Sequence, residues 1–169
     1  MTRTALTTLA LLAVVGCSAC IRGKETSFFR NFSMRTLVEN YKSHAGLDCG
    51  SIGGGGGGST FGFAAVGGGF PRGEYHSNKG DAYFCHLNSG GAQLDEAALI
   101  EGLATDVEGA ITSSGAKYID RQTHGPTSIV LNYTSGNANG HIEISGRRMP
   151  NDQYFLQANL EESGKSTWW

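Results

Sequence analysis

Three segments of the chain, 128–134, 141–145 and 154–160, alternate apolar and polar residues, and this pattern constrains the fold more than any other feature. The apolar positions are Ile129, Leu131, Tyr133, Ile142, Ile144, Tyr154, Leu156, Ala158 and Leu160. Successive side chains of a β-strand point to opposite faces, so each segment has one apolar and one polar face. The short spacing between the segments predicts an antiparallel meander with one face buried.

A single strong helix pattern precedes the meander. Asp95 is a good N-cap, an apolar stripe runs from Leu99 to Ile111 at helical spacing, and Gly115 stands where a helix ends. Two further strands are expected on either side of the helix, at 82–87 and 117–122. We therefore predict an α+β two-layer sandwich in the order β-α-β-β-β-β, with one main helix packed on the antiparallel β-meander.

The amino-terminal residues have the character of an export signal. A short start charged by Arg3 is followed by an apolar run from Ala5 to Val15. As a helix this run spans about 16 Å, about half of a hydrocarbon core that is about 30 Å thick. It is too short for a stable transmembrane helix and is typical of a secretory signal.

The run ends at Val14-Val15-Gly16-Cys17, which resembles the lipobox of bacterial lipoproteins. The resemblance covers about the first twenty residues only. It implies that residues 1–16 are a signal peptide, removed before Cys17, and that Cys17 carries a covalent lipid with two or three acyl chains, enough for firm anchoring. An ordinary secretory signal is the alternative. Ser18 resembles the residue that follows the anchor cysteine in lipoproteins of the outer membrane, so we expect that location, facing the periplasm or cell surface, if the host has two membranes.

Export would place Cys20, Cys49 and Cys85 in a compartment that permits disulfides. We favour a Cys49–Cys85 bond over Cys20–Cys49 because Cys85 lies in an expected core strand, and Cys20 is then free or paired elsewhere. A metal site that combines Cys49 and Cys85 with His44 and His86 is disfavoured, since the neighbours Cys85 and His86 would point to opposite faces of a strand. We expect no metal and no cofactor beyond the lipid on Cys17.

The chain between the anchor and the predicted sandwich divides into two parts. Residues 17–49 form a lipid-anchored segment with an expected helix within 27–44, either lying on the lipid surface or, as we favour, docked on the globular domain. Residues 50–73 hold six consecutive glycines and are expected to be a flexible linker. Residues 74–169 then make up the α+β domain.

The polar face of the predicted sheet is the place to look for binding. The candidate residues on it are Asn132, His141, Glu143, Phe155 and Gln157. His141 and Glu143 are two residues apart, so we expect them to stand side by side and to be able to pair. An exposed aromatic ring at Phe155 among amides suits a carbohydrate, peptide or protein partner. The tail pair Trp168 and Trp169 is a second candidate contact, with the domain itself, the membrane or a partner.

Charge narrows the possible partners. The formal net charge is −2, and loss of residues 1–16 with Arg3 makes it −3. The chain therefore lacks the net positive charge that is typical of nucleic-acid-binding proteins. The sequence thus predicts a membrane-anchored lipoprotein of the cell envelope, a non-enzymatic module that binds another envelope protein or component. The alternative is a tethered hydrolase or other enzyme that uses polar residues of the sheet face, although the sequence shows no nucleophile–base motif.

Overall fold

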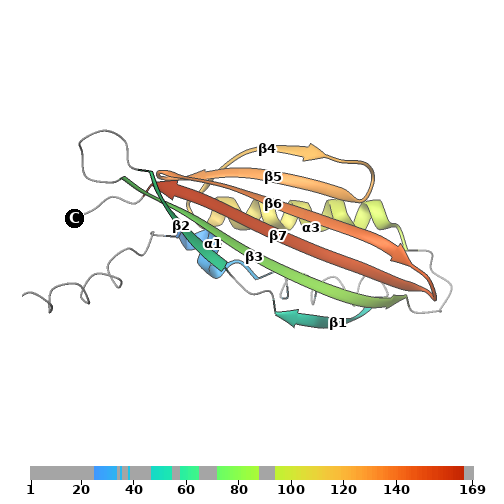
Figure 1. The fold of residues 1–169 in the computed structure, drawn as a ribbon. Helices are drawn as coiled ribbons and strands as arrows, with labels where there is room; N and C mark the ends of the chain where they lie inside the picture. Colours follow the sequence, from blue (N-terminus) through green and yellow to red (C-terminus); the bar gives the residue numbers. More distant parts are fainter. Residues whose placement is uncertain are drawn as a thin grey trace, which may run out of the picture.

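The computed structural model describes residues 25–33, 35, 38, 47–54, 58–64, 72–87 and 94–165, with only the backbone described in 51–54, 58–64 and 72–74 (Figure 1). The elements in chain order are α1 Ser27–Asn31, β1 Leu47–Gly54, β2 Gly58–Ala64, β3 Arg72–Leu87, α3 Glu96–Ser113, β4 Lys117–Thr123, β5 Ser128–Ser135, β6 Ala138–Met149 and β7 Gln153–Lys165.

All seven strands belong to one antiparallel sheet. Its order is β1-β3-β7-β6-β5-β4, and β2 pairs with β3 beside β1. The outer edge of β3 is therefore covered twice, by β2 along 72–78 and by β1 along 81–87. Strand β4 pairs only with β5 and forms the opposite edge. The long strands β3, β6 and β7 run side by side through the middle of the sheet (Figure 1).

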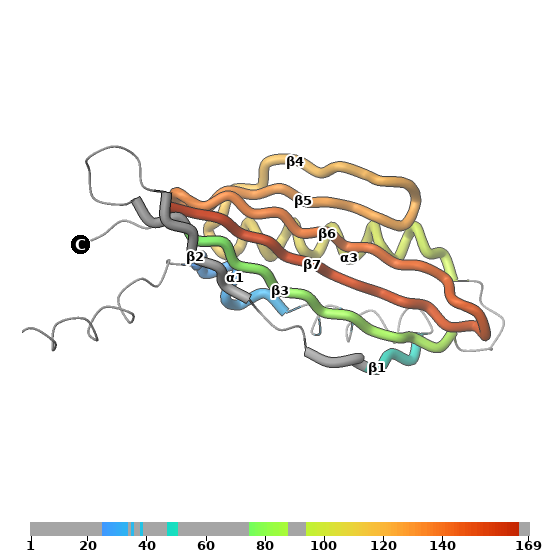
Figure 2. The backbone as a smooth tube through the Cα atoms, in the orientation of Figure 1, coloured from blue at the N-terminus to red at the C-terminus, as the bar shows by residue number. Residues whose placement is uncertain are grey.

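The predicted two-layer α+β sandwich was wrong. Strands make up 57% of the residues whose side chains are described, the helices in the described part of the chain are the short α1 and α3, and three strands precede α3 instead of one. The main contacts of helix α3 with described strands are to β4, β5 and β6, so it covers part of one sheet face (Figure 2). The molecule is mostly an antiparallel sheet. Two of the three early strands, β1 and β2, include glycine-rich residues of the range that we had expected to be a linker.

Helix α3 itself begins and ends as the sequence predicts. The side chain of Asp95 accepts a hydrogen bond from the Ala98 amide at 3.0 Å, which satisfies a free donor of the first turn. The chain leaves the helix through Ser114 and Gly115, whose φ of +81° is a conformation that glycine adopts without strain. The apolar stripe from Leu99 to Ile111 is buried against the sheet.

The sheet face beneath α3, which we call the inner face, carries the core. All nine predicted apolar positions between Ile129 and Leu160 are buried there. Tyrosine rings lie flat over glycines of neighbouring strands: a Cβ atom added to Gly140 would come within 2.1 Å of the Tyr133 ring, and Gly164 is covered by Tyr75 in the same way. These glycines leave space for rings that a longer side chain would displace.

The segment before the sheet is docked on this core. Phe28 and Phe29 of α1 and the later residue Val38 are all buried, and the Phe28 ring meets the Tyr133 ring edge-on with centroids 5.0 Å apart. An apolar segment packed in this way is docked on the domain, which was the favoured one of the two readings of 27–44. The structure also joins Cys49 to Cys85, the favoured pair, by a disulfide between directly opposed residues of β1 and β3.

Candidate functional site

The sheet face opposite the core, which we call the open face, is formed by the alternate residues of the same strands. Residues of this face with described side chains include His76, Asn78, Ala82 and Phe84 of β3, Phe155, Gln157, Asn159, Glu161 and Ser163 of β7, Asn139, His141, Glu143, Ser145 and Arg147 of β6, and Val130, Asn132 and Thr134 of β5. All are exposed or partly exposed. The face is rich in amide, hydroxyl and imidazole groups, which both donate and accept hydrogen bonds.

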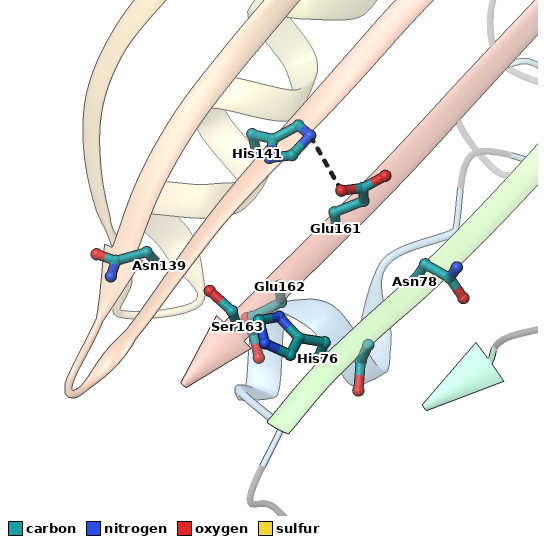
Figure 3. Close-up of a pocket in the computed structure, with 8 residues that line it drawn as sticks. His76, Asn78, Asn139, His141, Glu161, Glu162 and Ser163 are labelled. Atoms are coloured by element: carbon teal, nitrogen blue, oxygen red, sulfur yellow. Dashed lines mark ion pairs between the residues drawn. The ribbon is translucent and has the colours of Figure 1, made fainter. Parts of the chain in front are cut away.

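At one end of the open face lies a hollow of about 340 Å³, shown in Figure 3. Strand pairing explains how it is assembled. His76, Ser163 and Asn139 form one row across β3, β7 and β6, because each is the register partner of the next. Asn78, Glu161 and His141 form the next row along the same strands. The hollow therefore gathers side chains that are as much as 87 residues apart in sequence.

His141 pairs with Glu161 rather than with Glu143. Its Nε2 atom lies 3.6 Å from Oε2 of Glu161, and the two side chains are 45% and 63% exposed (Figure 3). Glu143 instead accepts a hydrogen bond from the Ser128 hydroxyl at 3.4 Å. The reason is strand geometry: directly opposed residues bring their Cβ atoms to about 5 Å, whereas positions i and i+2 of one strand are almost 7 Å apart. Our expectation named the wrong carboxylate.

An aromatic pair occupies the other end of the open face. The rings of Phe84 and Phe155 are tilted with centroids 5.3 Å apart, and the guanidinium carbon of Arg147 lies 5.3 Å from the Phe155 ring. Phe155 is the register partner of both Phe84 and Arg147. The sequence singled out Phe155 alone, because only strand pairing shows that a second ring and a cation stand beside it. Aromatic and cation–π contacts hold this cluster together.

The hollow and the aromatic pair are joined by the remaining open-face residues. Ser163 and Phe155 are eight residues apart on β7, a separation of about 27 Å in an extended strand. Gln157 lies between them, opposite Ala82 on one side and Ser145 on the other. Asn132, nearer the sheet edge, donates a hydrogen bond from Nδ2 to Asp120 of β4 at 2.6 Å. The structure thus brings Asn132, His141, Glu143, Phe155 and Gln157 to one face, with Glu161, Phe84 and Arg147 as neighbours that the sequence did not reveal.

Other predicted site residues lie outside the part of the chain that the structure describes. These are the lipid-attachment residue Cys17 and the tail pair Trp168 and Trp169. Among the described residues, no three His, Cys, Asp or Glu side chains are grouped so that they could hold a metal ion. Within the same residues, no helix has the length and apolar character needed to cross a membrane.

Comparison of the chain with protein-family models, with curated proteins and with solved structures found no match in any of the three.

Proposed function

We propose that the protein is a lipid-anchored lipoprotein of the bacterial cell envelope, held through Cys17, and that its open face binds an envelope component. The observation that supports the binding role is the open face itself. A row of hydrogen-bonding side chains about 27 Å long runs from the hollow at Ser163 to the partly exposed ring of Phe155.

The chemistry of this surface favours a ligand with both polar and apolar groups. Amides and hydroxyls can orient a partner through hydrogen bonds, while an aromatic pair supplies the apolar contact area that dominates many binding sites. The buried core that stabilises the fold lies on the inner face, so the open-face side chains remain available to a ligand. An envelope saccharide, a peptide or a protein loop has the mixed character that the open face complements.

The anchor is supported by the sequence alone, through the short apolar run and the tetrapeptide that ends at Cys17. Its test is the intact mass of the protein extracted in detergent from its native cells. We expect a chain that begins at Cys17 and carries two or three acyl chains. The Cys20→Ser variant should keep the lipid and the Cys17→Ser variant should lose it. A protein that begins elsewhere and carries no lipid would contradict the anchor.

The binding role has its own test. Phe155→Ala and Gln157→Ala should each reduce the amount of envelope component retained by the purified protein, whereas Asp106→Ala, on the exposed side of α3, should not. Equal retention by all three variants and the wild type would remove the open face as the binding surface.

A tethered enzyme is the second candidate, and the His141–Glu161 pair beside the hollow is the observation that favours it. A carboxylate can orient a histidine that acts as a general base. We rank it lower because both side chains are open to water, which weakens the electrostatic influence of one on the other. His141→Ala together with Glu161→Ala would abolish turnover of an envelope substrate if this candidate is correct.

A further inference from the structure

A buried carboxylate holds the amino-terminal segment of the described chain on the domain. Glu162 lies on the inner face near the end of β7, is 2% exposed, and points to the side of the sheet where α1 lies (Figure 3). We use the name strap for residues Glu25–Phe32, which include α1. A carboxylate is rarely buried unless it is well hydrogen-bonded, so its partners show what it does.

Four donors reach the two oxygens of Glu162, and two of them come from one residue of the strap. Oε1 accepts from the Thr26 amide at 2.9 Å and from the Tyr75 hydroxyl at 2.8 Å. Oε2 accepts from the Tyr133 hydroxyl at 2.6 Å and from the Thr26 hydroxyl. Burial and then the hydrogen bond to Glu162 raise the pKa of both tyrosines above the ordinary value, so both keep the protons that they donate.

The strap depends on these contacts for its structure. Thr26 is also the N-cap of α1, where its hydroxyl accepts from the Phe29 amide at 3.1 Å. At the other end of α1, the ammonium of Lys79 donates to the carbonyls of Phe29 and Arg30 at 2.5 and 3.0 Å and lies over the Phe29 ring. A helix of five residues is far too short to be stable alone, so α1 exists because the sheet holds it at both ends.

This docking limits the distance between the domain and an anchor at Cys17. Glu25 is eight positions beyond Cys17, and a fully extended chain over that distance reaches at most about 29 Å. If the strap left the sheet, the next buried residue in the described chain would be Val38. Val38 is 21 positions beyond Cys17, so the extended chain between the anchor and the docked domain could then reach about 76 Å.

We propose that Glu162 is a latch: with the strap held by Glu162, the open face stays close to the membrane, and release of the strap extends the range that the face can reach. The reach part of this inference rests on the proposed lipid anchor. The latch itself does not, because it concerns only contacts between the strap and the sheet.

The latch is tested by hydrogen exchange of the full-length lipidated protein in detergent. Glu162→Gln removes the charge, and Thr26→Val removes the strap hydroxyl without changing the sheet. We expect both to speed the exchange of strap amides at least tenfold, and by a larger factor than the amides of β5 and β6, where Tyr133 of β5 is itself a partner of Glu162. Glu161→Gln, a neighbour on the opposite face, is the matched control and should leave the strap unchanged.

Two results would overturn the latch. One is a strap that exchanges at the wild-type rate in both variants. The other is an equal acceleration in β5 and β6, because Glu162 would then serve only the stability of the sheet.

The reach is tested by energy transfer from a fluorophore at position 106 on α3 to acceptor-labelled headgroups in phosphatidylethanolamine–phosphatidylglycerol vesicles that carry the lipidated protein. Transfer should fall in the Glu162→Gln protein relative to wild type and to Glu161→Gln. If strap exchange is faster but energy transfer does not fall, the proposed change in reach is contradicted. The role of Glu162 in holding the strap is then unaffected. A protein isolated without lipid would overturn the anchor, and the exchange experiment would still decide the latch.

Discussion

Glu161 and Glu162 are neighbours on β7 with the same side chain, yet they serve the protein in different ways. The side chain of Glu161 is 63% exposed on the open face and forms a water-accessible pair with His141, whereas Glu162 is 2% exposed on the inner face and accepts hydrogen bonds from Tyr75, Tyr133 and Thr26. Buried polar groups on the inner face can form hydrogen bonds only with other groups of the protein, so the fold sets their partners. Polar groups on the open face are satisfied by water and are available to a ligand.

The largest expected difference comes from replacing these two glutamates in turn. Glu162→Leu leaves the hydroxyls of Tyr75 and Tyr133 and the Thr26 amide buried without their acceptor, and should lower the free energy of unfolding by about 3–5 kcal/mol. Glu161→Leu should change it by no more than about 0.5 kcal/mol. Equilibrium unfolding in urea measures both. Similar losses for the two variants would contradict the division between the faces.

The disulfide extends the inner-face core to the edge strand β1. Cys85 is fully buried, and its bond to Cys49 closes a loop of 36 residues. Replacing both cysteines by alanine should lower the free energy of unfolding by about 3–4 kcal/mol, because the unfolded chain regains the freedom of the open loop. A reducing agent should destabilise the wild type by a similar amount and leave the double variant unchanged. A double variant as stable as the oxidised wild type would contradict this contribution.

A pair of glycine substitutions sharpens the comparison between crowded and open positions. Gly140→Ala forces a Cβ atom into the Tyr133 ring and should destabilise the protein by about 1–3 kcal/mol. Gly109→Ala, on α3 with nothing within 4 Å of the added atom, should stabilise it by about 0.5–1 kcal/mol. Thermal unfolding of the two variants would show shifts of opposite sign. Stabilisation by Gly140→Ala would mean that the ring does not lie where we describe it.

A ring on the open face should contribute less to stability than a buried ring of the strap. Phe155→Ala removes a partly exposed ring and should cost about 1 kcal/mol, since little area is returned to water. Phe28→Ala, which removes a buried ring of the strap, should cost about 3–5 kcal/mol. Urea unfolding compares them directly. An equal loss for both would show that Phe155 supports the fold, which would weaken its proposed role in binding.

The features that the sequence predicts correctly depend on local patterns. Asp95 and Gly115 mark the ends of α3 because capping acts within a few residues, and alternation identifies β5 and the centre of β7 because each strand has one buried face. The glycine-rich strand β1 was missed because glycine lacks the side chain that makes alternation visible, while its backbone pairs like that of any residue.

Long-range pairing accounts for the other misses. The His141–Glu161 pair depends on the register between β6 and β7, which no local pattern specifies. Glu162 was not singled out from the sequence, because the inward row was ended at Leu160. Its position could have been found, since it continues the inward row that runs through Ala158 and Leu160. A charged residue in phase with a buried row is the signal that was present in the sequence.

Photo-crosslinking in the native cells tests the central claim, that the open face is the binding surface of an envelope-anchored protein. A photoreactive side chain would be placed either at Gln157, in the middle of the open face, or at Asp106, on the exposed side of α3. We predict a discrete crosslinked species from position 157 that disappears when Phe155 is replaced by alanine, and none from position 106. Crosslinks from position 106 alone, or from both positions equally, would contradict the account.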